Sequence, residues 1–153
     1  MVNGLNLELD QRRLTIELGW KAGHWVGCPE RWQECLIADH APERTWRHLD
    51  TMQFETRIRA RVPRSQCREH GVKAVAVPWA EPGSRFALFF KRFAIAVLLP
   101  SKSLRQACEL PALDWDAALR IMERTVRRGW DRCELEALKY AGIDEKSFEA
   151  GQS

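Results

Sequence analysis

The spacing of apolar residues changes near the middle of this chain, and that change limits the possible folds more than any other feature. Before position 78, residues 5–19 and 52–62 alternate apolar and polar side chains, which is the period of a half-buried β-strand. After position 84, apolar residues recur with the 3.6-residue period of an α-helix. The sequence therefore predicts the α+β class, with a small β-rich module followed by a helical module.

The β-rich half contains three predicted strand regions. Residues 5–19 interrupt their alternation at Asp10 and Gln11, which predicts a hairpin of two short strands. Residues 52–62 carry arginines at alternate positions, which predicts a strand with one wet, basic face. Residues 72–77, VKAVAV, are expected to pair with that strand.

A cluster of turn residues separates the two halves. Pro78, Pro82 and Gly83 prevent a continuous helix or strand, and Ser84 is placed to cap the helix that follows. With 153 residues, the chain is long enough for two small modules. The expected units are a β module, a helical module and a C-terminal remainder, at residues 1–82, 83–132 and 133–153.

Two helices are predicted directly after the boundary. The first ends at Pro100, and Ser103 is placed to cap a short second helix over residues 104–110. In the second helix, Leu104, Ala107 and Cys108 are expected to face one way. The expected apolar face of the first helix consists of Phe86, Phe89, Phe90, Phe93, Val97 and Leu98.

A third, longer helix is predicted to begin after a cap at Asp114 and to end at Gly129. A short helix, a tight turn and a longer helix form the layout of a helix-turn-helix unit, which enters the major groove of DNA. The apolar face of this third helix is expected at Trp115, Leu119, Met122 and Val126. The residues expected to contact double-stranded DNA are Lys102, Arg105, Gln106, Asp116, Arg120, Arg124, Arg127 and Arg128.

The β-rich half also carries residues that can bind a metal ion. Cys28 follows the predicted hairpin, and Cys67 and His70 have the Cys-x-x-His spacing of a knuckle between two strands. Two such knuckles on neighbouring hairpins can hold one tetrahedral zinc ion, as in a zinc ribbon. A Cys-x-x-Cys knuckle would need a cysteine at Arg31, so Cys35 is the candidate for the fourth ligand. The alternative interpretation is that the cysteines are small buried apolar residues.

Composition limits the remaining possibilities. The formal net charge is only +3, so composition alone does not identify a nucleic-acid-binding protein. The N-terminus has no export signal, and the most apolar segment, residues 86–100, is shorter than the roughly 20 residues that span a bilayer. We therefore expect a cytoplasmic, nucleoid-associated protein with no membrane partner. Five cysteines, an odd number, argue against a disulfide framework.

No catalytic set of side chains can be assembled from this sequence. Cys108 and Cys133 have no histidine nearby in sequence. Asp144 and Glu145 lie near the C-terminus, whereas two-metal phosphoryl chemistry needs several carboxylates from distant segments. We expect no enzyme activity from this chain.

Several blocks of the chain, in this order, resemble the N-terminal part of bacterial ISL-three family transposases. They are "GCPE", "RTWRHLD", "RVPRSQCREHGV", "VPWAEPGSRF", "FAIAVLL", "DWDAALRIMERTVRRG" and "GIDEKSF". The resemblance implies a zinc-ribbon-like module, a helix-turn-helix that binds transposon terminal inverted repeats, and then a ribonuclease-H-like catalytic domain. It implies that residues 133–153 open that catalytic domain, so a truncated transposase that binds DNA without cutting it is expected.

Two departures from the family pattern are visible. Arg31 stands where the family has a zinc-binding cysteine, and Ala112 stands in a turn where relatives have glycine. Alanine tolerates a positive φ poorly, so this turn is expected to be strained or reshaped. The alternative function is an interaction module that self-associates or docks on full-length transposase. Most of the tryptophans, including Trp46, Trp79 and Trp115, are expected in the core rather than at such a surface.

Overall fold

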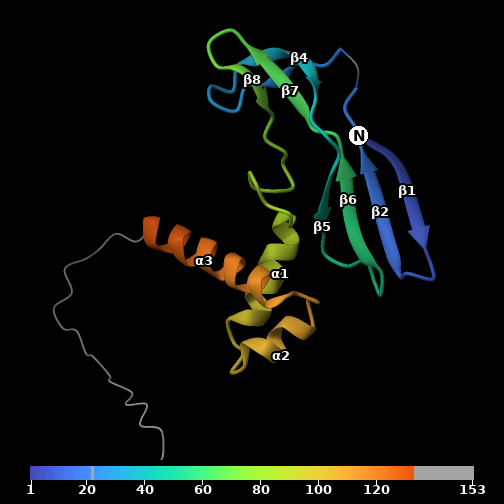
Figure 1. The fold of residues 1–153 in the computed structure, drawn as a ribbon, viewed down its shortest axis with the longest axis vertical. Helices are drawn as coiled ribbons and strands as arrows, with labels where there is room; N and C mark the ends of the chain where they lie inside the picture. The colour runs from blue at the N-terminus through green and yellow to red at the C-terminus, as the bar shows by residue number, and fades with distance from the viewer. Residues whose placement is uncertain (22, 133–153) are drawn as a thin grey trace, which may run out of the picture.

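The computed structural model describes residues 1–21 and 23–132, in which eight strands are followed by three helices (Figure 1). The strands are β1 (Val2–Glu8), β2 (Arg13–Leu18), β3 (Val26–Gly27), β4 (Glu34–His40), β5 (Arg44–Arg47), β6 (Glu55–Ala60), β7 (Pro63–Cys67) and β8 (Gly71–Ala74). The helices are α1 (Leu88–Leu98), α2 (Leu104–Glu109) and α3 (Trp115–Asp131). The predicted α+β class is confirmed, and the predicted unit at 133–153 lies outside the described residues.

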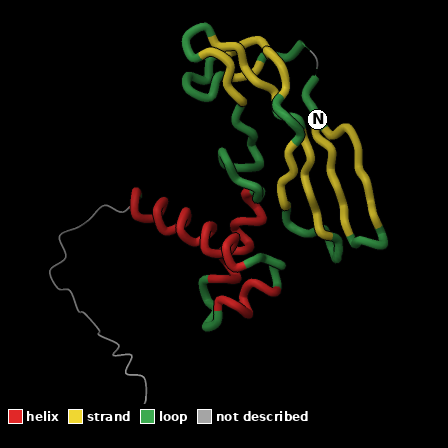
Figure 2. The backbone as a smooth tube through the Cα atoms, viewed as in Figure 1, coloured by secondary structure: helices red, strands yellow, loops and turns green. Residues whose placement is uncertain are grey.

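The strands form two four-stranded sheets, which are drawn in yellow in Figure 2. The first sheet has the order β1-β2-β6-β5, and the second has the order β3-β4-β7-β8. β1 and β2 are the predicted antiparallel hairpin, with Leu5 opposite Ile16. β2 and β6 are parallel, and a parallel pair needs a long connection between its strands. That connection contains β3, β4 and β5, so the two sheets are interleaved along the chain.

One face of the first sheet holds the core of the β-rich half. Trp46 on β5 and Ile58 on β6 lie opposite one another and are buried. Val75, Val77 and Trp79 pack against them from the segment between β8 and α1, residues 75–87, which we call the linker. The rings of Trp46 and Trp79 meet edge to face, with centroids 5.7 Å apart. The linker therefore covers the first sheet before it leads to the helices.

The predicted pairing of residues 72–77 with residues 52–62 is wrong. β8 pairs with β7, while β6 already has β2 on one edge and β5 on the other. β7 was not predicted because its buried positions are Pro63, Ser65 and Cys67, which do not form an apolar alternation. A strand whose buried face consists of small, polar or sulfur-bearing residues carries little periodic signal.

The helix caps match the sequence prediction only in part. The N-cap of α1 is Ala87 rather than Ser84, whose hydroxyl bonds to the backbone N–H and carbonyl of Phe86 at 3.0 and 2.8 Å. Ser103 is the N-cap of α2, but its side chain makes no capping hydrogen bond. At α3 the prediction is confirmed, because Asp114 accepts a 2.6 Å hydrogen bond from the backbone N–H of Ala117.

The apolar face predicted for α1 is wrong at one position. Phe89 is 62% exposed, whereas Lys91 is buried with only 4% of its surface accessible. Phe90, Ala94 and Leu98 complete the buried side of the helix. A charged residue lies inside because Glu81 of the linker pairs with it, as described below.

The three helices share one small core, formed by Leu98, Ala107, Cys108 and Ala118. The expected orientation of Ala107 and Cys108 is therefore confirmed. α3 does not end at Gly129 as predicted but continues to Asp131. Among the described helices, none combines the length and the apolar character needed to cross a membrane.

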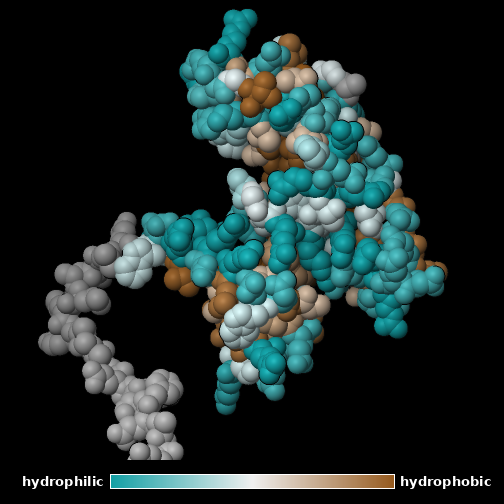
Figure 3. Space-filling model, in the orientation of Figure 1, coloured by the Kyte–Doolittle hydropathy of each residue, from teal (hydrophilic) through white to brown (hydrophobic). Residues whose placement is uncertain are grey.

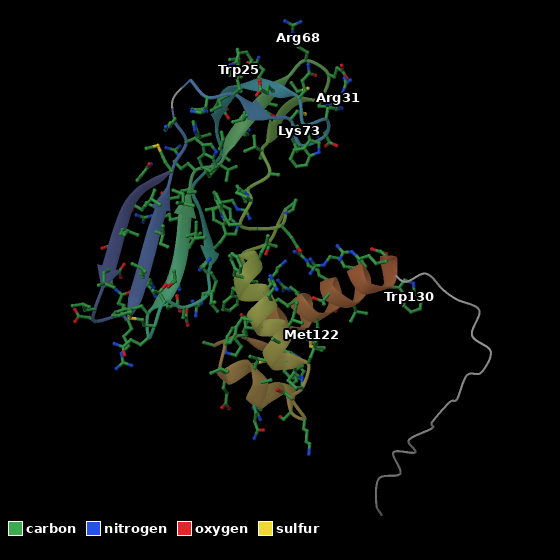
Figure 4. All side chains as sticks on the ribbon, turned by 180° about the vertical axis from the view of Figure 1, so that it is seen from behind. Trp25, Arg31, Arg68, Lys73, Met122 and Trp130 are labelled. Atoms are coloured by element: carbon green, nitrogen blue, oxygen red, sulfur yellow. The ribbon has the colours of Figure 1, made fainter. Side chains whose placement is uncertain are left out.

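The apolar face predicted for α3 is wrong except at Met122, which packs against the helical core. Trp115, expected in the core, is 52% exposed, and Leu119 and Val126 are exposed too. The residues that α3 buries are Ala117, Ala118 and Ile121. Helices approach as closely as the side chains at their contact allow, so the alanines admit α1 and α2 where larger residues would not. Trp130 extends from the far end of α3 (Figure 4).

Candidate metal centre and nucleic-acid interface

The first half of the metal centre is a turn between β3 and β4. The backbone N–H of Cys28 donates to the carbonyl of Gln33 at 2.9 Å, and Trp32 donates to the carbonyl of Cys28 at 2.7 Å. Trp32 takes a positive φ of 57°, which lets the turn close. The turn holds Cys28 directly after β3 of the second sheet, where its side chain is fully buried.

The second half is the turn between β7 and β8. Cys67 ends β7, and Gly71 begins β8 with a positive φ of 68°, a conformation that glycine adopts without steric cost. His70 precedes that glycine, and its Nδ1 lies 3.5 Å from the Sγ of Cys67 and 3.7 Å from the Sγ of Cys28. The donor atoms of Cys28, Cys67 and His70 all lie within 4.8 Å of one another. Three of the four predicted ligands therefore converge.

Local hydrogen bonding favours the thiolate form of Cys67. The backbone N–H groups of His70 and Glu69, together with the His70 side chain, lower the pKa of Cys67 to about 6. Burial raises the pKa of Cys35, and the neighbouring Cys67 raises it further. The site thus favours one thiolate beside a histidine, and a metal cation would favour further deprotonation.

Cys35 lies next to this group rather than within it. It packs with Cys28 and Cys67 in a cluster of buried cysteines, and its Sγ donates to the carbonyl of Gln33 at 3.5 Å. It begins no knuckle, because it stands inside β4 opposite Val26. Its role as fourth ligand stays a prediction.

Arg31 occupies the knuckle position of the absent cysteine, and its side chain is exposed. Its guanidinium forms an ion pair with Glu69 on the other turn. Arg31 and Arg68 mark the two turns at this end of the second sheet (Figure 4). The two turns are therefore connected by an exposed ion pair, whereas a cysteine at position 31 would have connected them through the metal ion.

The eight residues predicted to contact DNA all keep accessible surface. Seven are exposed, and Arg128 is half-buried. Within residues 1–21 and 23–132, Arg120, Arg124 and Arg127 form no ion pair. Arg128 differs, because its guanidinium pairs with Glu81 of the linker. That pair reduces the capacity of Arg128 to hold a phosphate.

Sequence reasoning missed the residues of the linker that meet the helices. Glu81 accepts a 2.5 Å hydrogen bond from the buried Nζ of Lys91, in addition to its pair with Arg128. Burial raises the pKa of Glu81, but its hydrogen bond to Lys91 and the charges of Lys91, Arg128 and Arg124 outweigh burial and lower the pKa overall. Arg85 donates to Asp114, the α3 cap, at 3.0 Å. No local pattern signals these contacts, since their partners are 10 to 47 residues apart.

The knuckles and their donors define a zinc ribbon, and comparison with known families agrees. Residues 28–70, from the first cysteine to the histidine, match the family described as the zinc-finger of transposase IS204/IS1001/IS1096/IS1165. This segment is therefore similar to the zinc ribbons of these transposases. The family and the clustered donors Cys28, Cys67 and His70 fit zinc as the bound metal.

A curated relative supports the same assignment. Over 110 residues, 69% of this chain, the sequence is 34% identical to the transposase for insertion sequence element IS1557 of Mycobacterium tuberculosis, in strains CDC 1551 and H37Rv. The chain spans only 24% of the length of that relative. No solved structure matches this chain.

Proposed function

We propose that this chain binds double-stranded DNA and recognises the terminal inverted repeats of an insertion sequence, without catalysing strand transfer. The observation that carries the proposal is the row of Arg120, Arg124 and Arg127, which are exposed and form no ion pair within the described residues. Guanidinium groups in this state are available for phosphate oxygens. The relationship to a transposase supports the choice of DNA over other polyanions.

We assign a separate role to each of three segments of the chain. Residues 1–82 form the zinc-ribbon-like module, residues 83–132 present α3 to the major groove, and residues 133–153 belong to a catalytic region. In this arrangement, Lys102 and Arg105 of the α2 region contact phosphates beside the groove. Gln106 and Asp116 are assigned to base edges instead, because a carboxylate repels phosphate but can accept a hydrogen bond from cytosine. The three-helix core and the Asp114 cap support a rigid α3.

Duplex binding across a range of salt concentrations tests the function. The probes are a duplex carrying a terminal inverted repeat of IS1557 and a scrambled duplex of equal length, followed by fluorescence polarisation. We expect affinity to fall linearly with salt on logarithmic axes, and replacement of Arg120, Arg124 and Arg127 by Gln to reduce the slope by about 0.9 for each phosphate that is no longer neutralised. Arg92→Gln, on the exposed surface of α1, is the matched control. Salt-independent binding, or an unchanged slope in the triple variant, would contradict the proposal.

A second candidate is self-association through α3, with a second copy or a full-length transposase as partner. Its support is the exposed apolar row that the helical core leaves uncovered, namely Trp115, Leu119, Val126 and Trp130. Sedimentation velocity on the full chain tests it. We expect the dimer to disappear in a Val126→Ser, Trp130→Ser variant if this row is the contact, and a monomer in the unmodified chain at high concentration would rule the contact out.

A further inference from the structure

A small cavity lies where the linker meets the middle of α3. Its volume is about 120 Å³, and it is lined by Gly83, Ser84, Arg85, Phe86, Lys91, Arg120, Ile121 and Arg124. Sites for drug-sized ligands and cofactors occupy about 300 Å³ or more. This cavity therefore suits a small group, and its lining contains four cationic side chains and no carboxylate.

The positive charge in this cavity is only partly neutralised. Glu81 forms an ion pair with Lys91, and Asp114 accepts a hydrogen bond from Arg85. Arg120 and Arg124 have no carboxylate partner in the described part of the chain. The cavity therefore carries an excess of positive charge, which favours an anion.

Two contacts fix the guanidinium of Arg85 beside the cavity. Its guanidinium lies over the ring of Phe86, 5.2 Å from the ring centroid, and the same guanidinium donates to Asp114 at 3.0 Å. The ring of Phe86 in turn stacks on Phe90, with centroids 5.3 Å apart. A guanidinium fixed in this way loses little conformational freedom when its remaining donors bind an oxyanion.

We propose that this cavity binds a phosphate group, held by Arg85 of the linker together with Arg120 and Arg124 of α3. The inference rests on the proposed function in taking a DNA backbone phosphate as the natural ligand. Figure 3 shows the surface hollowed between the second sheet and α3, with hydrophilic residues along the side of α3 that borders the hollow. A DNA strand following this hollow passes the cavity, so the linker becomes part of the DNA interface.

Duplex binding by Arg85 variants tests the site. In fluorescence polarisation with the IS1557 end duplex, we expect Arg85→Gln to weaken binding about tenfold and to reduce the salt slope by about 0.9. Arg85→Lys keeps the charge but loses the bidentate guanidinium donor. Its affinity for the duplex is expected to lie between those of wild type and Arg85→Gln. The double variant Arg85→Gln, Arg120→Gln should lose less than the product of the two single losses, because both side chains hold the same phosphate. Circular dichroism checks that each variant is folded.

A second measurement separates this site from the proposed function. Inorganic phosphate is titrated into the ¹⁵N-labelled full chain, and the Nε–H resonance of Arg85 is followed with Arg92 as reference. We expect a saturable shift at Arg85 that Arg120→Gln removes. If phosphate shifts Arg85 but no duplex binds, the anion site stands and the DNA function falls. If duplex binds while Arg85→Gln behaves like Arg92→Gln and phosphate leaves Arg85 unmoved, the phosphate site is overturned and the DNA function stands.

Discussion

At the scale of single residues, Arg31 and Cys35 decide how the metal centre differs from a complete ribbon. Arg31 occupies the second knuckle position and pairs with Glu69, whereas Cys35 lies in β4 beside the sulfur cluster. A structural zinc site normally closes with four protein ligands. Because Arg31 cannot bind zinc, two possibilities remain for the fourth ligand: Cys35 completes the site, or another ligand takes the fourth position.

Restoring the missing thiol should strengthen zinc binding. We expect Arg31→Cys to raise zinc affinity by at least about tenfold, since a directly bound thiolate contributes more than the outer hydrogen bonds whose loss costs about tenfold or more. Chelator competition measures the change, and Arg31→Ala separates the new thiol from the lost ion pair. Cys35→Ser completes the comparison: equal zinc retention in Cys35→Ser and wild type would show that Cys35 is not the fourth ligand.

Ala112 is a second residue with a local effect, because it adopts a positive φ of 48° in the turn between α2 and α3. Glycine is the favourable residue in this conformation, since it has no Cβ to clash with the backbone. We expect Ala112→Gly to stabilise the chain by up to about 1 kcal/mol, since relief of αL strain outweighs the added entropy of the unfolded chain. Urea unfolding measures the difference, and a loss of stability would contradict this account. Gly129→Ala is a helix-propensity control, because a Cβ added at this position of α3 would meet no atom within 4 Å.

At the scale of elements, Glu81 connects the linker to two helices. It pairs with Lys91 on α1 and with Arg128 on α3, and Lys91 is otherwise buried in the helical half. A buried ammonium without its partner is costly. The single carboxylate therefore stabilises the position of α1 and α3 against the linker.

Glu81→Gln should destabilise the helical half by about 1 to 3 kcal/mol, because it leaves the Lys91 charge uncompensated. The effect should depend on pH. Since the folded pKa of Glu81 is lowered below its ordinary value of 4.5, the stabilisation is complete above that value and is lost as pH falls through the lower folded pKa. Urea unfolding of wild type and variant at pH 7 and in acid measures this, and a stability difference that stayed constant on acidification would contradict it. Glu43→Gln is the control, because Glu43 is an exposed carboxylate just before β5 that pairs with Arg59 on the first sheet.

At the scale of the whole molecule, the two sheets differ in what stabilises them. The first sheet has an aromatic and aliphatic core around Trp46 and Ile58, whereas the buried cluster of the second sheet consists of Cys28, Cys35 and Cys67. Such a small cluster buries little apolar area. The second sheet is therefore the part of the molecule that depends most on its metal.

Removing zinc should unfold the second sheet before the other parts. We expect a strong chelator to abolish amide protection in β4, β7 and β8, while α1 and α3 keep their protection, because metal binding contributes about 10 kcal/mol or more in small zinc modules. Hydrogen exchange followed by mass spectrometry measures this by segment. Uniform loss of protection would show a single cooperative unit, and no loss would show a ribbon stable without metal.

Much of this protein could be predicted from local patterns, and particular residues show where local patterns stop. The order of β-rich and helical halves, the β1–β2 hairpin, the Asp114 cap and the grouping of Cys28, Cys67 and His70 follow from periodicity and spacing within short segments. β3, β4, β5 and β7 were not predicted, and in β7 the buried residues Pro63, Ser65 and Cys67 form no apolar alternation.

By itself, the sequence determined the order of the β-rich and helical halves and the spacing of Cys28, Cys67 and His70, since turns, caps and period are properties of neighbouring residues. Only the tertiary structure decided that β8 pairs with β7, that α3 buries its alanines and leaves Trp115 outside, and that Glu81 holds Lys91. Each of those outcomes depends on competition between surfaces far apart in the chain, where the closest packing and the pairing of buried charge determine the result.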